Sequence, residues 1–262
     1  MMSLHFKYAV MLFLLLSMGC TKAPITNRYQ MILTDSSEDI AKGEKYAKII
    51  LRRSKVNTNS KENTMVQEVG RRIAKVVNSE YGTTDYQWRF YLIENEERAN
   101  AFCFSGGKVF VYTGLFKYIE NEDELAVVMG HEIAHALARH GAERKTSSKF
   151  SEAGNRILNF LGTYQKKSIP LERKWMRKQN KEMIDRWIML PHSRTQEYEA
   201  DKIGLFLSSK AGYNPKASIT FWKKFAKDKQ EKSEYESTHP NPVHRIEALK
   251  KLIPFEKYNQ RI

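Results

Sequence analysis

Apolar positions along the chain recur with two periods, and each period predicts a type of element. Residues at 88–93 alternate with a period of two, and the apolar run at 108–112 follows two glycines, so both segments are expected to be strands. Apolar residues spaced three or four apart favour helices over about 36–54, 62–78 and 195–210, with further helices after Asn214-Pro215 and from Pro242. No repeat of fixed period occurs, so the pattern predicts a mostly helical α+β domain with a small β-sheet.

One helix has particularly clear boundary signals. Asn121 can cap its first turn, and Glu124 three residues later gives a start that resembles a capping box. Gly141 is the expected C-terminal stop. The helix is therefore predicted to run from just after Asn121 to Gly141.

This helix contains the sequence His131-Glu132-Ile133-Ala134-His135. Residues four apart share one face of a helix, so both imidazoles can point at one metal ion. Glu132, about 100° further round, can reach a water molecule at that ion without binding the ion itself. Zinc would lower the pKa of the water, and Glu132 would accept its proton as general base. The alternative is a surface helix with two solvated histidines.

A catalytic zinc ion needs a third protein ligand. His140 is the nearest candidate, but it is nine residues from His131, about half a turn out of phase, and is therefore expected on the opposite face of the helix. In the helix at 195–210, Glu197 and Asp201 are four residues apart and share a face, whereas Glu199 is turned away by about 200°. One of the two carboxylates can bind zinc while the other orients a ligand histidine.

The first twenty residues have the pattern of an export signal. Residues 8–16 form an apolar run that is too short to span a bilayer, and Gly19-Cys20 follows shortly after it. The segment resembles a bacterial lipoprotein signal, with Cys20 as the lipidated residue. A cleaved signal peptide without lipid, or an anchor that stays attached, are the alternatives. We therefore expect a signal peptide at 1–19, a membrane-proximal tether at 20–35 and one domain at 36–262.

The formal net charge of +14 would alone suggest nucleic acid or an anionic surface as partner. An exported chain rarely meets nucleic acid, so we expect no nucleic-acid partner and favour anionic lipid or acidic envelope polymers. The segment at 142–192 concentrates the charge: residues 143–192 hold twelve Lys or Arg against five acidic residues. This segment is either a charged face over an ordinary core or a lid-like insertion that contacts anionic lipid or substrate.

With these motifs in place, the chain resembles the gluzincin zinc metallopeptidases of the HtpX and prenyl-protease family, in particular their lipoprotein quality-control branch without helical repeats. The resemblance covers most of the mature chain. It is carried by the zinc motif and by Asn100-Ala101-Phe102, Gly106-Gly107, Val111, Thr113-Gly114-Leu115, Ser193-Arg194, Glu197-Tyr198-Glu199-Ala200-Asp201, Ser237-Thr238-His239-Pro240, Arg245 and Pro24-Ile25-Thr26-Asn27-Arg28.

The resemblance implies a role for each motif residue. It makes Glu197 the third ligand of one zinc ion per chain, beside His131 and His135, and Asp201 the partner that orients a ligand histidine. His239 becomes either a stabiliser of the transition state or a switchable extra ligand, with Arg245 in support. Asn100, Ala101 and Phe102 would belong to an edge strand that flanks the zinc helix and holds a peptide substrate through its backbone.

Together these readings predict a membrane-anchored zinc endopeptidase acting on misfolded or misassembled proteins of the bacterial envelope. It would face the periplasm, with the outer membrane preferred over the inner. The main alternative is a latent or non-catalytic zinc-bound module that acts as a chaperone or binding protein. A third possibility is binding of envelope polymers through the positive surface.

Overall fold

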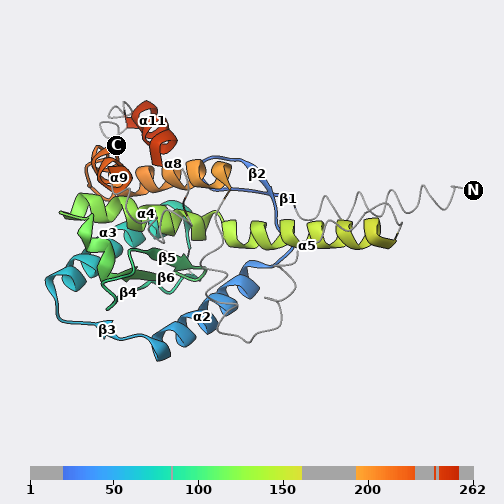
Figure 1. Ribbon diagram of the computed structural model, residues 1–262, viewed down its shortest axis with the longest axis horizontal. Helices are drawn as coiled ribbons and strands as arrows, with labels where there is room; N and C mark the ends of the chain where they lie inside the picture. Colours follow the sequence, from blue (N-terminus) through green and yellow to red (C-terminus); the bar gives the residue numbers. More distant parts are fainter. Residues whose placement is uncertain (1–19, 84, 161–192, 228–238, 240–241, 254–262) are drawn as a thin grey trace, which may run out of the picture.

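The computed structural model of the chain describes residues 20–83, 85–160, 193–227, 239 and 242–253. A four-stranded sheet in the order β3-β4-β6-β5 lies at its centre (Figure 1). Its strands are β3 (Val56–Asn57), β4 (Arg89–Ile93), β5 (Ala101–Phe104) and β6 (Lys108–Tyr112). β4 and β6 are parallel, and the other pairs are antiparallel. β5 lies at an edge of this sheet, as expected, and the two strands predicted at 88–93 and 108–112 are confirmed.

The residues of β6 alternate between two apolar layers, which explains why this strand is buried along its whole length. Val109 and Val111 face the larger core, whereas Phe110 and Tyr112 face a smaller core under α2 (Ser36–Arg53). Gly106 and Gly107, with φ of 88° and 84°, allow the tight hairpin that joins β5 to β6. The sheet is therefore covered on both faces, by α2 on one and by the zinc-motif helix on the other.

Two further helices frame this arrangement. α3 (Lys61–Tyr81) starts at Ser60, whose hydroxyl accepts a hydrogen bond from the Asn63 amide, and it ends at Gly82 with a left-handed φ of 57°. α8 (Arg194–Lys210) starts with a complete capping box formed by Ser193 and Gln196. The C-terminal region adds α9 (Ala217–Lys227) and α11 (Pro242–Leu252), so the helix predictions in this part are confirmed.

The zinc-motif helix α4 (Glu122–Leu137) packs against α8 on one side and against α3 and β5 on the other (Figure 1). The Asn121 side chain accepts a hydrogen bond from the Glu124 amide, as predicted. The predicted stop at Gly141 is wrong, because the helix ends at Leu137 and Arg139 adopts a left-handed φ of 53°. A new helix, α5 (His140–Phe160), begins directly after this elbow and contains Gly141.

The segment expected to be a tether is folded against the domain. β1 (Cys20–Lys22) and β2 (Tyr29–Met31) form an antiparallel hairpin in which Cys20 pairs with Met31. Ala23 is only 1% exposed and belongs to the larger core. The turn residues Ile25 and Asn27 have positive φ, which gave no periodic signal in the sequence. Residues 20–35 are therefore part of the domain and not a free linker.

Several expectations concern residues outside the described ranges. These are the signal peptide at 1–19 and most of the basic segment, at 161–192; of that segment, only 142–160 lies in the described helix α5. Within the ranges that the structure does cover, no helix combines the length and apolar character needed to cross a bilayer.

Candidate metal centre and active site

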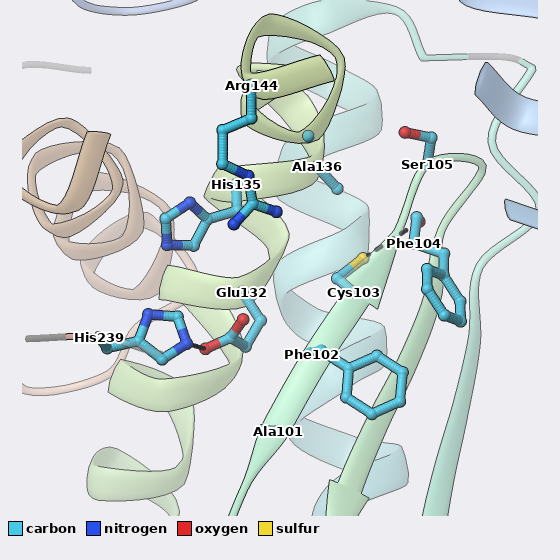
Figure 2. A pocket seen from close by; sticks show the side chains of 11 residues that line it. Ala101, Phe102, Cys103, Phe104, Ser105, Glu132, His135, Ala136, Arg144 and His239 are labelled. Carbon is cyan, nitrogen blue, oxygen red and sulfur yellow. Dashed lines mark hydrogen bonds and ion pairs between the residues drawn. The ribbon is translucent and has the colours of Figure 1, made fainter. Parts of the chain in front are cut away.

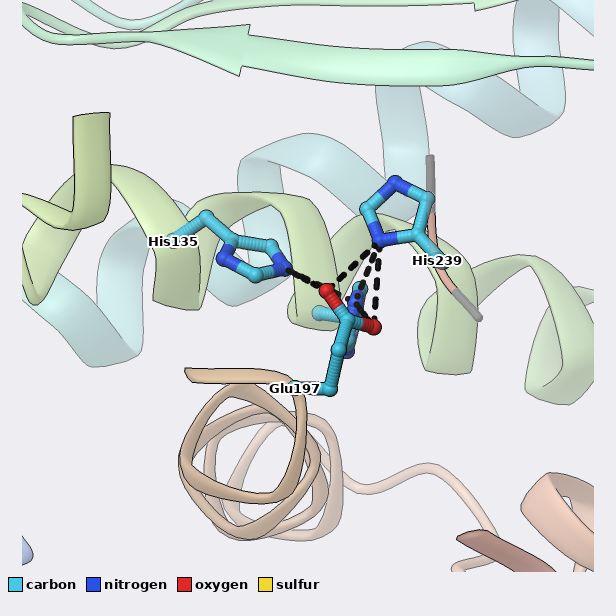
Figure 3. A group of neighbouring side chains, drawn as sticks. His135, Glu197 and His239 are labelled. Carbon is cyan, nitrogen blue, oxygen red and sulfur yellow. Dashed lines mark hydrogen bonds and ion pairs between the residues drawn. The ribbon is translucent and has the colours of Figure 1, made fainter. Parts of the chain in front are cut away.

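Four buried side chains bring their ligand atoms together between α4 and α8. They come from His131 and His135 on α4, Glu197 on α8 and His239, and these atoms all lie within 4.8 Å of one another. Figure 3 shows three of them, His135, Glu197 and His239. The two Nε2 atoms of His131 and His135 are 2.9 Å apart. The Glu197 carboxylate lies 3.4 Å from each of these nitrogens. The structure thus brings Glu197, the residue that the resemblance implies as third ligand, together with both histidines.

These distances fit a zinc ion. Ligand atoms at the corners of a tetrahedron with zinc bonds of about 2.0–2.1 Å are separated by about 3.3 Å, close to the 2.9–3.4 Å observed here. Two imidazoles and one carboxylate also form the donor set typical of a catalytic zinc site. The residues present thus suit one zinc ion, held by His131, His135 and Glu197.

Glu197 and Asp201 of α8 have different partners. The Asp201 Oδ1 atom lies 3.0 Å from His131 Nδ1, the ring nitrogen that does not face the ligand cluster. A carboxylate in this position fixes the tautomer and orientation of a ligand histidine. Arg245, which is 1% exposed, donates from Nε to Asp201 at 2.7 Å and places Nη1 2.9 Å from Glu197. The resemblance placed Arg245 in support of His239, and its ion pairs here are with Asp201 and Glu197.

His135 is oriented by residues that the sequence reasoning did not assign to the site. Its Nδ1 atom lies 2.8 Å from Nδ1 of His140, whose Nε2 lies 3.0 Å from Glu199. His140 was expected on the opposite face of one long helix. The elbow at Arg139 instead turns the chain, and His140 therefore lies beneath His135. The helix break has no glycine or proline to mark it, so no sequence signal could have revealed it.

The buried surroundings of the centre shift the pKa values of its ligand side chains in different directions. Burial and Arg245 lower the pKa of His131, but the Asp201 and Glu197 carboxylates outweigh both and raise it to about 9. Burial would raise the pKa of Glu197, yet His239, Arg245 and the ligand histidines hold it well below its usual range. Burial and the neighbouring His131 lower the pKa of His135, which keeps this imidazole neutral. His135 and Glu197 are thus in the forms that bind a divalent cation, whereas His131 must release a proton when the cation binds.

A pocket opens between α4 and the edge strand β5 (Figure 2). It is lined by Ala101, Phe102, Cys103, Phe104, Ser105, Glu132, His135, Ala136, Gly141, Arg144 and His239. Glu132 is 2% exposed, and its Oε1 atom lies 3.5 Å from Nε2 of His239. Nδ1 of the same ring lies 3.2 Å from Nε2 of His131 and 3.1 Å from Glu197. His239 therefore faces the ligand atoms with one nitrogen and Glu132 with the other.

The β5 residues lie on the other wall of this pocket. The Ala101–Phe104 backbone pairs with β6 along one edge only, and no strand of the described chain pairs with its other edge. Phe102 packs into the smaller core under α2, and its side chain points away from Glu132 (Figure 2). Asn100 is 1% exposed and accepts a hydrogen bond at its carbonyl from Tyr112. These positions present backbone to the pocket and little side chain.

Cys103 also lines the pocket, but its thiol is not in the form of a nucleophile. Desolvation of its thiol, together with the nearby Glu132, raises its pKa. The thiol is therefore neutral, and the thiolate that a cysteine nucleophile requires is not formed. Arg144 also reaches the pocket, and burial lowers the pKa of its guanidinium to about 10. This side chain was counted in the basic segment but was not predicted to face the site.

Comparison with known proteins gives relatives that are all named as metalloendopeptidases or proteases. Mitochondrial metalloendopeptidase OMA1 of Saccharomyces cerevisiae is 27% identical over 250 residues, covering 89% of this chain and 69% of the yeast protein. The OMA1 protein of Schizosaccharomyces pombe is 34% identical over 70% of this chain and 52% of its own length. The β-barrel assembly-enhancing protease of Escherichia coli is 31% identical over 69% of this chain and 37% of its own length. The chain thus spans between about a third and two thirds of these relatives.

The family match covers the whole centre described above. Residues 60–253 match peptidase family M48, a range that includes α4, α8 and His239. The relatives are metalloendopeptidases or proteases by name, and the clustered histidines and glutamate suit the zinc that this family uses. The chain belongs to peptidase family M48, the zinc metallopeptidase family that its sequence motifs predicted.

Proposed function

We propose that this chain is a zinc endopeptidase that hydrolyses peptide bonds in misfolded or misassembled proteins of the bacterial envelope. The observation that carries the proposal is the meeting of His131, His135 and Glu197 next to the carboxylate of Glu132. Three protein ligands leave a position open for water or substrate, as catalytic zinc sites require. A buried carboxylate beside that position is suited to general-base work.

The side chains divide the chemistry among them. Bound zinc supplies a Lewis acid that activates water and polarises the substrate carbonyl. Glu132 accepts a proton from water as its oxygen adds to the carbonyl carbon and forms the new C–O bond. It then delivers this proton to the amide nitrogen, so that the C–N bond breaks and the amine leaves. Asp201 holds His131 in its ligand tautomer. Arg245 balances the charge of Glu197 and Asp201 on α8.

The edge strand supports an endopeptidase that selects little by side chain. A substrate in extended form can pair at Ala101 and Phe102 with the edge of β5 that no described strand occupies, with Asn100 directly before the strand. Backbone pairing gives affinity that depends weakly on sequence. An unfolded segment of an envelope protein offers the extended backbone that such pairing needs.

The cellular setting rests on the N-terminus and on a relative. The pattern of 1–19 and the exposed Cys20 suit a lipid-anchored protein facing the periplasm, with the outer membrane preferred. The E. coli relative is named for assembly of β-barrels, which supports an envelope substrate. The OMA1 relatives are mitochondrial, so this part of the proposal depends on the export signal. Contact of 142–192 with anionic lipid would add to the anchor.

The experiment compares two variants for zinc content and for cleavage of a labelled unfolded protein such as casein. Glu132→Gln removes the base but no ligand, so it should keep its zinc and lose at least about 10²-fold in rate. Glu197→Ala removes a ligand and should lose both zinc and cleavage. Full activity of Glu132→Gln would overturn the mechanism, and unchanged zinc in Glu197→Ala would remove that residue from the ligand set.

A second candidate function follows from His239. Its Nδ1 atom lies among the ligand atoms of the cluster, where it can act as a fourth ligand and hold the centre in a latent state. A latent protein would bind unfolded clients without cutting them. His239→Ala should then raise casein cleavage, whereas a role for His239 in stabilising the transition state predicts a fall. Cleavage that is absent in both proteins, with zinc bound, would favour a binding module.

A further inference from the structure

A chain of hydrogen bonds connects His135 to the N-terminal hairpin. His135 reaches the metal cluster through Nε2, so its neutral ring carries the proton on Nδ1 and donates to His140 Nδ1 at 2.8 Å. The His140 ring then carries its own proton on Nε2 and donates to Glu199 at 3.0 Å. One set of tautomers satisfies every ring nitrogen in this chain.

Glu199 is held in turn by the hairpin turn. Arg28 donates from Nε to Glu199 Oε2 at 2.6 Å, and the Thr26 hydroxyl donates to the other carboxylate oxygen. The two Nη atoms of Arg28 donate to both oxygens of Glu143 on α5, at 2.7 and 2.9 Å. A guanidinium that bridges two carboxylates has a fixed plane and position. Arg28 therefore ties the hairpin to α5 and α8 at once.

The chain after the hairpin is tied to the same elbow. Arg139, the residue with the left-handed backbone, donates from Nη2 to the Thr34 carbonyl and to Asp39, each at 2.6 Å. The Leu33 amide donates to the Thr146 hydroxyl of α5 at 3.1 Å. Residues 26–39 therefore contact the elbow between α4 and α5 on both sides of β2. This is the elbow that places His140 under His135.

We infer that Arg28 and Glu199 are positioning residues that act through His140 to hold His135 for metal binding. The N-terminal hairpin is thus part of the support of the metal centre, although it lies outside the matched family range of 60–253. Outer hydrogen-bond partners of ligand histidines commonly change metal affinity by about 10–100-fold. The inference rests on the proposed zinc site, and its test reads metal binding and not cleavage.

The test measures zinc affinity of the purified chain by competition with a chromophoric chelator. Glu199→Ala should weaken zinc binding by about 10–100-fold, and Arg28→Ala by about tenfold. Glu199→Gln keeps an oxygen that can accept from His140, so it should bind zinc more tightly than Glu199→Ala. The control is Arg72→Ala, because Arg72 is also part-buried but donates to the carbonyl of Ala211, which follows the C-terminal end of α8. It should leave zinc affinity unchanged.

A second readout tests the coupling in the opposite direction. If the hairpin supports the ligand, zinc must in return stabilise the hairpin, because linkage is reciprocal. Hydrogen exchange at 20–34 should slow on zinc addition in the wild-type chain and slow much less in Glu199→Ala. Wild-type zinc affinity in both Arg28→Ala and Glu199→Ala would overturn the inference and leave the zinc site intact. A wild-type chain that binds no zinc would overturn the proposed function and this inference with it.

Discussion

The contact between two glycines sets the separation of the two metal-binding helices. Gly204 of α8 faces Gly130 and His131 of α4, and a Cβ on Gly204 would lie 2.7 Å from the His131 amide nitrogen and 2.8 Å from the Gly130 carbonyl carbon. Ordinary contacts of such atoms begin at about 3.4 Å, so Gly204→Ala forces the backbones apart by about 0.7 Å. Backbone atoms cannot rotate away as the end of a side chain could. The helices themselves must therefore move.

This displacement acts on the metal centre because the ligands lie on both helices. Glu197 and Asp201 move with α8, whereas His131 and His135 stay with α4. Metal–ligand distances tolerate only about 0.2 Å of change, so we expect zinc affinity to fall by tenfold or more. Overpacking costs about 1–3 kcal/mol, and the better helix propensity of alanine returns about 1 kcal/mol. The net loss of folding stability is therefore expected to be about 2 kcal/mol at most.

Chelator competition gives the zinc affinity of Gly204→Ala, and urea unfolding without metal gives its stability. Gly82→Ala is the control, since Gly82 has a φ of 57° at the end of α3 and an added Cβ would meet nothing within 4 Å. Forcing alanine into this left-handed conformation costs about 1–2 kcal/mol without touching the metal centre. Gly82→Ala should thus lose stability and keep its zinc affinity. Wild-type affinity in Gly204→Ala would refute the argument that this contact sets the ligand geometry.

Three further predictions concern charge and metal. The pKa of Glu143 is lowered in the folded chain, because hydrogen bonds from Arg28 and Gln196 outweigh its burial. The ionised carboxylate therefore stabilises the folded state above the ordinary pKa of 4.5, and this stabilisation is lost as the pH falls below that value. Glu143→Gln should therefore be about 1 kcal/mol less stable than wild type in urea at about pH 7, with a smaller difference at about pH 3.5; an equal difference at both would contradict this assignment. Asp201→Asn leaves the buried Arg245 with one carboxylate fewer, so we expect its free energy of unfolding to fall by about 3 kcal/mol. We also expect weaker zinc binding, and a zinc affinity equal to wild type would show that Asp201 does not orient His131. Removing zinc with a chelator should lower the thermal midpoint, because an ion present at about 100 times its Kd stabilises the folded chain by about 2.7 kcal/mol; a midpoint that does not respond to zinc would argue against binding.

Local spacing was enough to predict the two pairs of side chains at the metal centre, and the family resemblance was needed to choose Glu197 over Asp201 as the ligand. His131 and His135 are one helical turn apart, and so are Glu197 and Asp201, so each helix brings its pair to one face without help from the rest of the fold. The strand at 108–112 was equally clear from its apolar run. In these cases the period of the sequence and the packing of the domain agree.

The support behind His135 could not be predicted in this way. It depends on the left-handed Arg139, on the turn at Ile25 and Asn27, and on an ion pair between Arg28 and Glu199, residues 171 apart in sequence. Of these residues only Asn27 belongs to a type that is enriched at positive φ, and the conformations of Ile25 and Arg139 are imposed by tertiary contacts. The same reasoning explains why residues 20–35 were mistaken for a tether: a short hairpin held by side-chain ion pairs has no periodic pattern.

The pairing of Cys20 with Met31 has a consequence for where the enzyme can work. A free tether over 20–35 would allow the domain to lie up to about 50 Å from an anchored cysteine, because an extended chain spans about 3.3–3.6 Å per residue. Because the hairpin begins at Cys20 itself, a lipid on that residue would instead hold the peptidase domain close to the bilayer surface. Only substrate segments that are exposed close to the membrane surface would then reach the active site.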